Sequence, residues 1–477
     1  MAWKYFGEWN NIPLFYCLFW YHREVNENLK KYFNTSRKLG FCIIKRKQYL
    51  FLDTQWLKDL REQVYLTSAH EIITQLQSFY PEFEMVRDSL FSYYNKSFEE
   101  LSDKELEESF QKILHLIRSV TPFDQYSMIS EQFHLEKFHD ELNKLSGVDK
   151  THLSILCSPT KITSTQEEEL SLINLALKIQ QGKELSKEAI HNHLKKFGWL
   201  PVFLFGKPWD EKYVKDEVSR LVKEDDLQSR KERLDNFPDE QRNKISRLQD
   251  ELSFPKELKD LAKVMQEIAF IRNEAETMIS LGTFVLLPIY KEIYRRINLP
   301  EEKISTLTPE EIGHILIENK DFSEEINKRL NAAFYVSTPE ISIIYDSNPA
   351  LQMFSENYKK PERETSQEKL EGMCASQGKA TGKVCIVRTL EDMNNFNGGD
   401  ILVSESTCID FVPVMRRAAA ILTEMGGITS HAAIVSRELG VPCIVGINSL
   451  LKMLQNGQIV EVNANEWVVK VVGTGLE

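Results

Sequence analysis

The stretch that decides the fold of the C-terminal part of this chain is AAAILTEMGGITSHAAIVSRELGVPCIVG, residues 418–446. Its first five residues, 418–422, are apolar and predict a buried strand, and residues 443–445 predict the next strand. Between them a glycine pair allows a tight turn, two residues of helix-capping type follow, and a short helix ends at Gly440. The sequence therefore predicts strand, glycine turn, helix and strand, with His431 in the first turn of the helix.

The residues around His431 suit an anion. Free backbone N–H groups and the positive end of the helix dipole converge at a helix start, and they keep a nearby imidazole neutral. Gly426 and Gly427 leave room for a phosphate donor, while Thr429 and Ser430 offer hydroxyls to phosphoryl oxygens. We therefore expect His431 to point outward, to attack a phosphoryl group and to carry it as a phosphoramidate. On spacing alone, a helix cap with an incidental histidine explains the segment equally well.

These residues closely resemble the phosphohistidine signature of the PEP-utilising enzymes, which include phosphoenolpyruvate synthase, pyruvate phosphate dikinase, Enzyme I of the sugar phosphotransferase system and rifampicin phosphotransferase. Three further stretches are similar to that family's mobile domain: ASQGKATGKV at 375–384, GDILV at 399–403 and DFVPVM at 410–415. The resemblance covers roughly residues 371–472. It implies a swivelling β/β/α domain in which His431 is the phosphorylated histidine. It also implies that Thr429 is a regulatory candidate, because some dikinases are switched off by phosphorylation of the corresponding threonine.

Composition limits the classes of partner. The 477 residues carry a formal net charge of −12, which argues against non-specific binding to nucleic acid and against docking on anionic lipid. The seven cysteines are scattered and form no CxxC pair, so we expect reduced thiols and no metal site. The apolar residues 12–20 include a proline and are too few to span a bilayer. These features predict a cytoplasmic protein with neither nucleic acid nor membrane as a partner.

The sequence before residue 355 predicts helices with small β-hairpins. Two pairs of short apolar runs predict the hairpins: 41–44 with 49–52, and 334–336 with 341–344. Asp53 or Thr54 is expected to cap one helix, and Thr308-Pro309-Glu310-Glu311 is a capping box at the start of another.

Two stretches of this region predict buried helical faces. The aromatic residues between positions 1 and 35 predict a packed first helix. A second helix with an apolar stripe follows Pro255. Three polar residues lie within it, and we expect them on its solvent side rather than facing a cavity: Arg272, Glu274 and Glu276.

The predicted fold class is α+β multidomain. A large, mainly helical domain over residues 1–354 is expected to bind an acceptor, and residues 371–477 form the swivelling β/β/α phosphohistidine domain. Residues 355–370 are polar, contain one proline and lack an apolar period, which is typical of a linker. A phosphohistidine that visits more than one site needs such a linker.

The family resemblance also indicates which partners to expect. The glycine-rich phosphate loops of an ATP-grasp domain are missing from the first three hundred residues, and too few residues follow the signature for a PEP/pyruvate barrel. We therefore expect ATP and Mg²⁺ on a separate ATP-grasp protein, no cofactor on this chain alone, and a phosphotransferase that passes the phosphoryl group to a small-molecule acceptor. The alternatives are a phosphocarrier and a regulatory binding protein acting on a partner enzyme.

Overall fold

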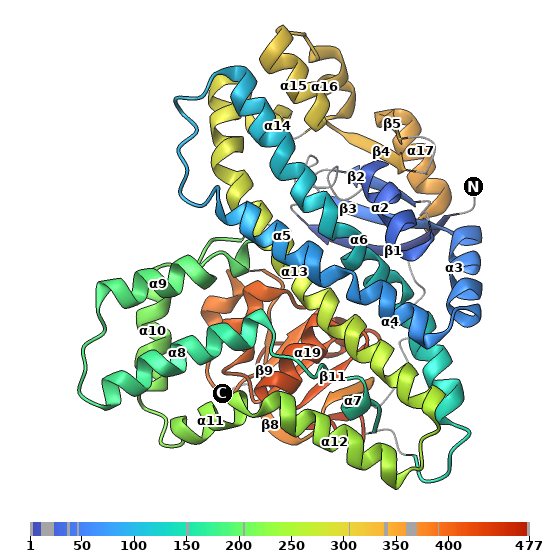
Figure 1. The fold of residues 1–477 in the computed structure, drawn as a ribbon, viewed down its shortest axis with the longest axis vertical. Coiled ribbons are helices and arrows are strands. Elements are labelled where there is room, and N and C mark those ends of the chain that lie inside the picture. Colours follow the sequence, from blue (N-terminus) through green and yellow to red (C-terminus); the bar gives the residue numbers. More distant parts are fainter. Residues whose placement is uncertain are drawn as a thin grey trace. The chain divides into compact units, whose positions relative to one another are not determined.

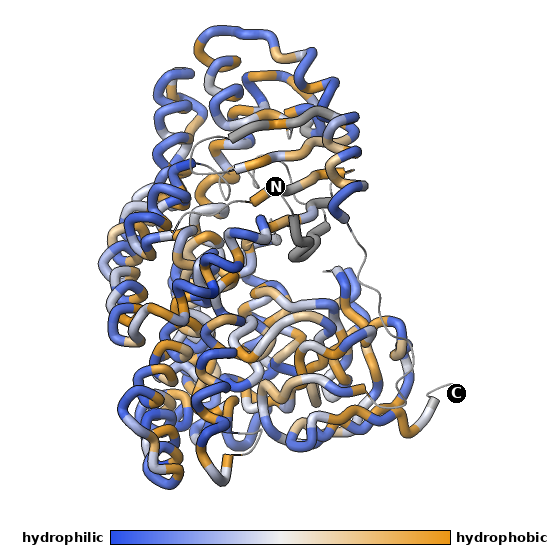
Figure 2. Tube along the Cα trace, turned by 90° about the vertical axis from the view of Figure 1, so that its right-hand side faces the viewer, coloured by the Kyte–Doolittle hydropathy of each residue, from blue (hydrophilic) through white to orange (hydrophobic). Residues whose placement is uncertain are grey.

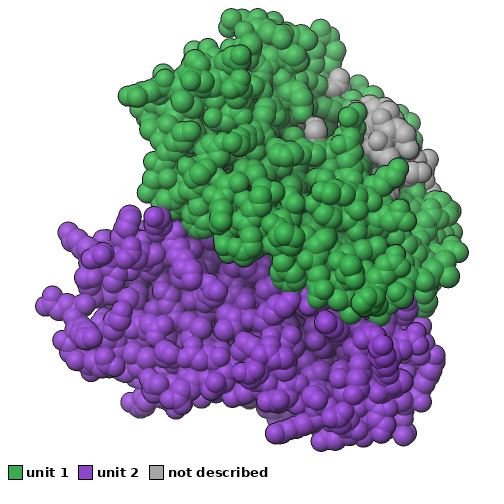
Figure 3. Space-filling view, in the orientation of Figure 1, with its two compact units in different colours: residues 1–130, 275–361 green, residues 131–274, 362–477 purple. Residues whose placement is uncertain are grey.

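The computed structural model describes residues 3–10, 23–35, 39–44, 47–148, 152–203, 206–304, 306–337, 342–358, 370–389 and 391–474. The chain divides into two compact units, coloured separately in Figure 3. Unit 1 comprises residues 1–130 and 275–361, and unit 2 comprises residues 131–274 and 362–477. The limits of these units differ from those of the predicted domains, residues 1–354 and 371–477. The predicted linker at 355–370 stays a prediction.

Unit 1 contains a five-stranded antiparallel sheet in the order β1-β3-β2-β4-β5. Its strands are β1 (Trp3–Asn10), β2 (Leu39–Ile44), β3 (Lys47–Asp53), β4 (Ala332–Ser337) and β5 (Ser342–Asp346). The structure confirms both predicted hairpins. It also joins them into one sheet, because β2 pairs with β4 although nearly three hundred residues separate the two strands.

The expected first helix is wrong over residues 3–10, which form β1 and pair with β3. Aromatic residues at positions 3, 5, 6 and 9 give this stretch a high strand propensity, and the pairing register with β3 shifts between Tyr5 and Gly7. The expectation holds over Arg23–Phe33, which form helix α2. The remaining aromatic residues of this cluster, between positions 11 and 22, lie outside the described residues.

The other helices of unit 1 surround or extend this sheet (Figure 1). They are α3 (Thr54–Leu66), α4 (Ala69–Gln77), α5 (Phe79–Phe91), α14 (Glu301–Ile304), α15 (Pro309–Glu318), α16 (Ser323–Arg329) and α17 (Ser347–Asn357). Asp53 caps α3 by accepting a hydrogen bond from the Trp56 N–H, as expected. Ala350 of α17 packs on Phe51 and Phe334 in the core beside the sheet.

Two long helices contribute residues to both units: α6 (Asp103–Leu142) and α13 (Lys256–Ile297). Within unit 1 they approach each other closely, because Gly282 of α13 lies against the side chain of Ile117 with no room for a Cβ.

Unit 2 begins with a group of helices that follow α6 in the chain. They are α7 (His152–Leu156), α8 (Ser164–Gln180), α9 (Lys187–Phe197), α10 (Glu211–Leu221), α11 (Leu227–Asp235) and α12 (Phe237–Glu251), with a short 3₁₀ turn η1 (Leu200–Val202). Apolar residues at helical spacing bring α8, α9, α10 and α11 together around Ile173, Val214 and Val218, which are fully buried.

The C-terminal part of unit 2 is an eight-stranded sheet in the order β6-β13-β12-β8-β9-β10-β11-β7. Its strands are β6 (Leu370–Glu371), β7 (Met373–Ser376), β8 (Lys379–Ile386), β9 (Ile401–Ser404), β10 (Ala420–Thr423), β11 (Cys443–Val445), β12 (Gln458–Asn463) and β13 (Val468–Thr474). Strands β8 to β11 are parallel neighbours, and the remaining pairs are antiparallel.

Short helices connect these strands. They are η2 (Asp392–Asn395), η3 (Ile409–Phe411), α18 (Val412–Met415), α19 (His431–Leu439) and α20 (Leu450–Met453). Hydrophobic and hydrophilic segments alternate along the chain (Figure 2), and Val403, Leu422 and Ile444 are completely buried in the sheet core. The predicted fold class, α+β multidomain with a β-rich C-terminal domain, is confirmed.

The capping box of α15 offers a test of a local stability prediction. Thr308 Oγ1 accepts from the Glu311 N–H at 3.1 Å, and Glu311 Oε2 accepts from the Thr308 N–H at 2.9 Å. We expect Thr308→Ala to lower the free energy of unfolding by about 1 kcal/mol, because a backbone donor loses its acceptor. Thr308→Ser keeps the hydroxyl and should unfold like the wild type. Thermal unfolding followed by circular dichroism distinguishes the two variants, and equal losses would contradict the capping account.

Candidate functional site

The site is built around the connection from β10 to β11. The two strands are parallel neighbours, so the chain crosses between them through α19. Ser430 is the N-cap of α19 and accepts from the Ala433 N–H at 3.4 Å. Gly440 ends the helix in the left-handed conformation, with φ of 65°. The structure thus confirms the predicted strand, turn, helix and strand.

Both turn glycines stand where a side chain would collide. Gly426 has φ of 107°, and a Cβ there would lie 2.9 Å from Ser430 Oγ. A Cβ at Gly427 would lie 2.9 Å from Oε1 of Glu131, which belongs to α6. The glycine pair was expected to admit a phosphate donor. In this structure Gly427 leaves room for the carboxylate of Glu131.

His431 is buried, with 5% of its surface exposed, rather than aimed outward. Nδ1 lies 2.9 Å from Thr407 Oγ1, while Nε2 is buried and has no hydrogen-bond partner. Burial, helped by the positive charge of Arg272, lowers the pKa of the ring to about 3. The imidazole is therefore neutral near pH 7, and when Nδ1–H donates to Thr407 the lone pair of Nε2 remains available.

Thr429 and Ser430 differ in what they offer. Thr429 has no exposed surface, and its Oγ1 is buried without a hydrogen-bond partner. Its backbone N–H donates to Glu131 Oε1 at 3.1 Å. Ser430 is also buried, and its Oγ serves the helix cap. The predicted phosphate-binding residues thus surround one N–H donor that already holds an anion.

The sequence patterns did not predict the ion pair between Arg272 and Glu131, which holds the Glu131 carboxylate in place. Glu131 Oε2 accepts from Nη1 of Arg272 at 2.8 Å. Arg272 was expected on the solvent side of α13, and that was wrong, because it pairs with α6 and keeps only 17% of its side chain exposed. Glu274 is likewise buried and accepts from both the N–H and the hydroxyl of Ser164. Its interruption of an apolar stripe was the signal in the sequence.

A second group of buried charges joins the sheet domain to α8 and α10. Arg416, next to α18, pairs with Glu168 of α8, and their side chains are 1% and 0% exposed. Tyr213 donates to Glu168 at 3.2 Å and accepts from Arg416 at 3.1 Å. Burial alone would raise the pKa of Glu168, but Arg416 and His193 hold it below its usual value. Glu168 is therefore ionised inside the protein.

The far end of α19 is also held by the helices. Thr163 donates to Glu438 at 2.8 Å, and burial raises the pKa of Glu438 to about 8. Arg437, to which we assign a structural role, donates to the carbonyl oxygens of Ala375 and Ile428. Both ends of the helix that carries His431 thus contact residues 131–274.

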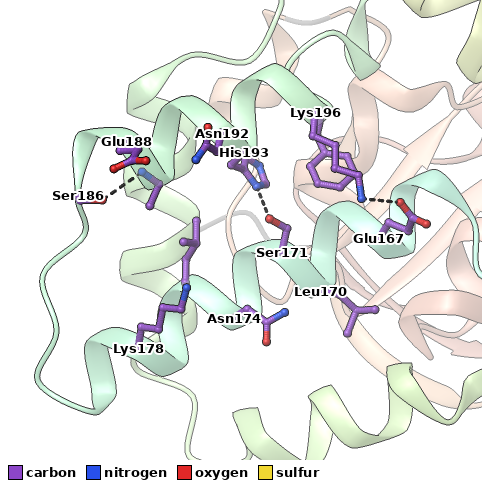
Figure 4. Close-up of a pocket in the computed structure, with 13 residues that line it drawn as sticks. Glu167, Leu170, Ser171, Asn174, Lys178, Ser186, Glu188, Asn192, His193 and Lys196 are labelled. Carbon is purple, nitrogen blue, oxygen red and sulfur yellow. Dashed lines mark hydrogen bonds and ion pairs between the residues drawn. The ribbon is translucent and has the colours of Figure 1, made fainter. Parts of the chain in front are cut away.

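A separate hollow of about 600 Å³ lies between α8 and α9 (Figure 4). His193 Nδ1 meets Ser171 Oγ there at 2.9 Å, and Lys196 pairs with Glu167 at 3.0 Å. Neither His431 nor Thr407 lines this hollow.

Two kinds of feature do not occur in the part of the chain that the structure describes. Among these residues, no helix is both long enough and apolar enough to cross a membrane. The same residues include no group of three or more His, Cys, Asp or Glu side chains suited to a metal ion.

Comparison with known proteins identifies the sheet domain. Residues 396–466 match the family model described as PEP-utilising enzyme, mobile domain. The chain carries a PEP-utilising mobile domain. All five predicted site residues lie inside the matched range, on the loop and helix between β10 and β11.

The mobile domain has relatives among phosphoenolpyruvate synthases. The probable phosphoenolpyruvate synthase of Archaeoglobus fulgidus is 37% identical over 181 residues, covering 36% of this chain and 24% of that protein. The probable synthase of Methanothermobacter thermautotrophicus is 45% identical over 100 residues, 21% of this chain and 15% of its own length. The synthase of Pyrococcus furiosus is 47% identical over 100 residues, 21% of this chain and 12% of its own. The chain thus spans a quarter or less of these relatives.

The Arg416–Glu168 pair predicts a large loss of stability on mutation. We expect Arg416→Met to lower the free energy of unfolding by about 3–5 kcal/mol, because Glu168 would remain buried without its cation. Adding Glu168→Gln should recover part of that loss. Lys212→Met, which removes an exposed ion pair, should unfold like the wild type. Urea unfolding checks this, and equal midpoints for Arg416→Met and Lys212→Met would contradict it.

The lowered pKa of His431 predicts a pH dependence. Between about pH 6.5 and 3 the unfolded chain binds a proton at His431 that the folded chain does not bind, so acidification reduces stability. This contribution changes by at most about 1.4 kcal/mol per pH unit. His431→Gln lacks it, so the difference in unfolding free energy between wild type and variant should shift in the variant's favour as pH falls through this range. Parallel stability curves would show that the ring titrates normally.

Proposed function

We propose that this chain is a phosphotransferase component in which Nε2 of His431 carries a phosphoryl group. The observation that supports it most is the state of the ring. His431 is neutral, Nδ1 is engaged by Thr407, and Nε2 has no hydrogen-bond partner beside the N-terminus of α19. A neutral nitrogen at the N-terminus of a helix is suited to attack phosphorus and to tolerate the anion that results.

The transfer takes place in three steps. Nε2 forms a bond to the β-phosphorus of ATP while the P–O bond to AMP breaks, its electron pair stays on the AMP oxygen, and the ring loses its Nδ1 proton to solvent. Water then cleaves the bond between the β- and γ-phosphoryl groups, so that inorganic phosphate leaves and one phosphoryl group remains on Nε2. An acceptor hydroxyl then forms a P–O bond, the P–N bond breaks with its electron pair returning to Nε2, and the hydroxyl proton passes to solvent. The acceptor is a small molecule bound within residues 1–354, and the hydroxyl is favoured over a carboxylate.

We place the phosphoryl donor on a separate protein. ATP and Mg²⁺ would bind an ATP-grasp partner, and the family chemistry would release AMP and inorganic phosphate. Because the His431 ring is buried, the mobile domain must leave the contacts described above to reach such a donor. Thr429 remains a candidate for reversible phosphorylation. Its hydroxyl is fully buried here, so the same movement would be needed to expose it.

Labelling with ATP tests the proposal. The chain is incubated with γ- or β-labelled ATP and candidate ATP-grasp proteins, and acid-labile, base-stable label is measured on this chain. We expect label on the wild type and none on His431→Ala. His431→Gln serves as a second, less disruptive variant and should also remain unlabelled. Label that persists on both variants would contradict the proposal, because another residue would then carry the phosphoryl group. A wild type that no partner labels would also contradict it and would favour a binding protein.

A further inference from the structure

The carboxylate of Glu131 lies where an anion would bind at the start of α19. Oε1 accepts from the Thr429 N–H at 3.1 Å and reaches it across Gly427, which has no side chain to block the approach. Oε2 accepts from Arg272 at 2.8 Å. One anionic group therefore receives hydrogen bonds from both a backbone N–H and a guanidinium, the arrangement that proteins commonly use for phosphate.

Two unsatisfied groups nearby indicate that a carboxylate uses only part of this site. Thr429 Oγ1 and His431 Nε2 are buried and have no hydrogen-bond partner. Buried polar atoms without partners are uncommon and costly, so they mark places where another ligand completes the bonding. The charge of Arg272 also reaches the ring, because it contributes to the lowered pKa of His431. A phosphoryl group has three oxygens and can satisfy more donors than one carboxylate can.

We infer that Glu131 is an internal stand-in for a phosphoryl group. It occupies an oxyanion site formed by the Thr429 N–H, Thr429 Oγ1 and Arg272, and the phosphoryl group on His431 displaces it. This inference rests on the proposed phosphotransfer and assigns Arg272 as the cation that then binds the phosphoryl oxygens. Before phosphorylation, Glu131 holds α19 against α6. After phosphorylation, two anions compete for the same donors, and the domain is released.

Chemical phosphorylation tests this without a partner protein. Phosphoramidate transfers its phosphoryl group to imidazole: an N–P bond forms at Nε2, the P–NH₃ bond breaks, ammonia leaves with its electron pair, and the imidazole proton passes to water. We expect Glu131→Gln to acquire phosphate at His431 about tenfold faster than the wild type, because a charge-assisted hydrogen bond that protects the site is lost. Mass spectrometry of the intact chain and its peptides gives the rate.

Two variants control for charge and for damage to the fold. Glu141→Gln removes a partly exposed carboxylate from the same helix and should label at the wild-type rate. Glu131→Asp keeps the charge but is one methylene shorter, so it should label nearly as fast as Glu131→Gln. Wild-type labelling rates in both Glu131 variants would overturn the inference, and so would acceleration in Glu141→Gln.

The role of Arg272 needs a readout that a merely structural residue would not change. In the background of Glu131→Gln, the ³¹P resonance of phosphorylated His431 should titrate at lower pH when Arg272 is present than when it is replaced by Met, because the guanidinium favours the more charged phosphoryl group. Identical titrations would remove Arg272 from the site.

Amide exchange separates this inference from the proposed function. The Thr429 N–H should exchange with deuterium faster in Glu131→Gln than in the wild type, and at the wild-type rate in Glu141→Gln. This measurement involves no phosphate. If no ATP-grasp protein labels His431 but Thr429 responds in this way, the proposed function fails and the Glu131 contact stands. Unchanged exchange at Thr429 would overturn the contact itself.

Discussion

A helix that begins inside a protein brings N–H groups with no acceptors of their own, and α19 is such a helix. Ser430 satisfies the N–H of Ala433, while the N–H of Thr429, just before the N-cap, has no acceptor within the helix. An acceptor must come from elsewhere. In this structure the acceptor is the carboxylate of Glu131 in α6. In a phosphotransfer reaction, an oxygen of the phosphoryl group could accept the same hydrogen bond. This contact depends on the absence of a side chain at Gly427, and it also involves Arg272, which pairs with the same carboxylate.

Local sequence patterns were sufficient to predict the elements that make up this site. The turn glycines, the N-cap at Ser430 and the left-handed Gly440 each act over a few residues, so the sequence alone indicates them. The capping box at Thr308 and the hairpins were predictable for the same reason. The resemblance to a known mobile domain then supplied the role that we propose for His431, which spacing alone left open.

Contacts between distant segments could not be predicted in this way. Glu131 and Thr429 are 298 positions apart, and no pattern of period two or 3.6 relates them. For the same reason, the sequence does not predict the pairing of β2 with β4 or the ion pair of Arg416 with Glu168. Polar residues inside an apolar stripe were the available sign. Arg272 and Glu274 were expected to face solvent because charged residues mostly do, yet in α13 they face α6 and α8. A charged residue on the apolar face of a long helix therefore indicates a buried polar partner on a neighbouring element.

The kind of contact that holds the mobile domain to the helices also bears on how it moves. Apolar surfaces separate at a cost that no ligand charge can change, whereas an ion pair or a charged hydrogen bond weakens when a competing charge arrives. The hydrogen bond from Thr163 at the last turn of α19 is largely uncharged near pH 7, because burial raises the pKa of Glu438 to about 8. The charged contacts are those of Glu131 with the loop before α19 and of Glu168 with Arg416 on the flank of the domain. Burial strengthens each of these contacts, and it would equally strengthen the repulsion between Glu131 and a phosphoryl group placed beside it. The same low-dielectric surroundings that keep His431 neutral would therefore make phosphorylation an effective signal for release.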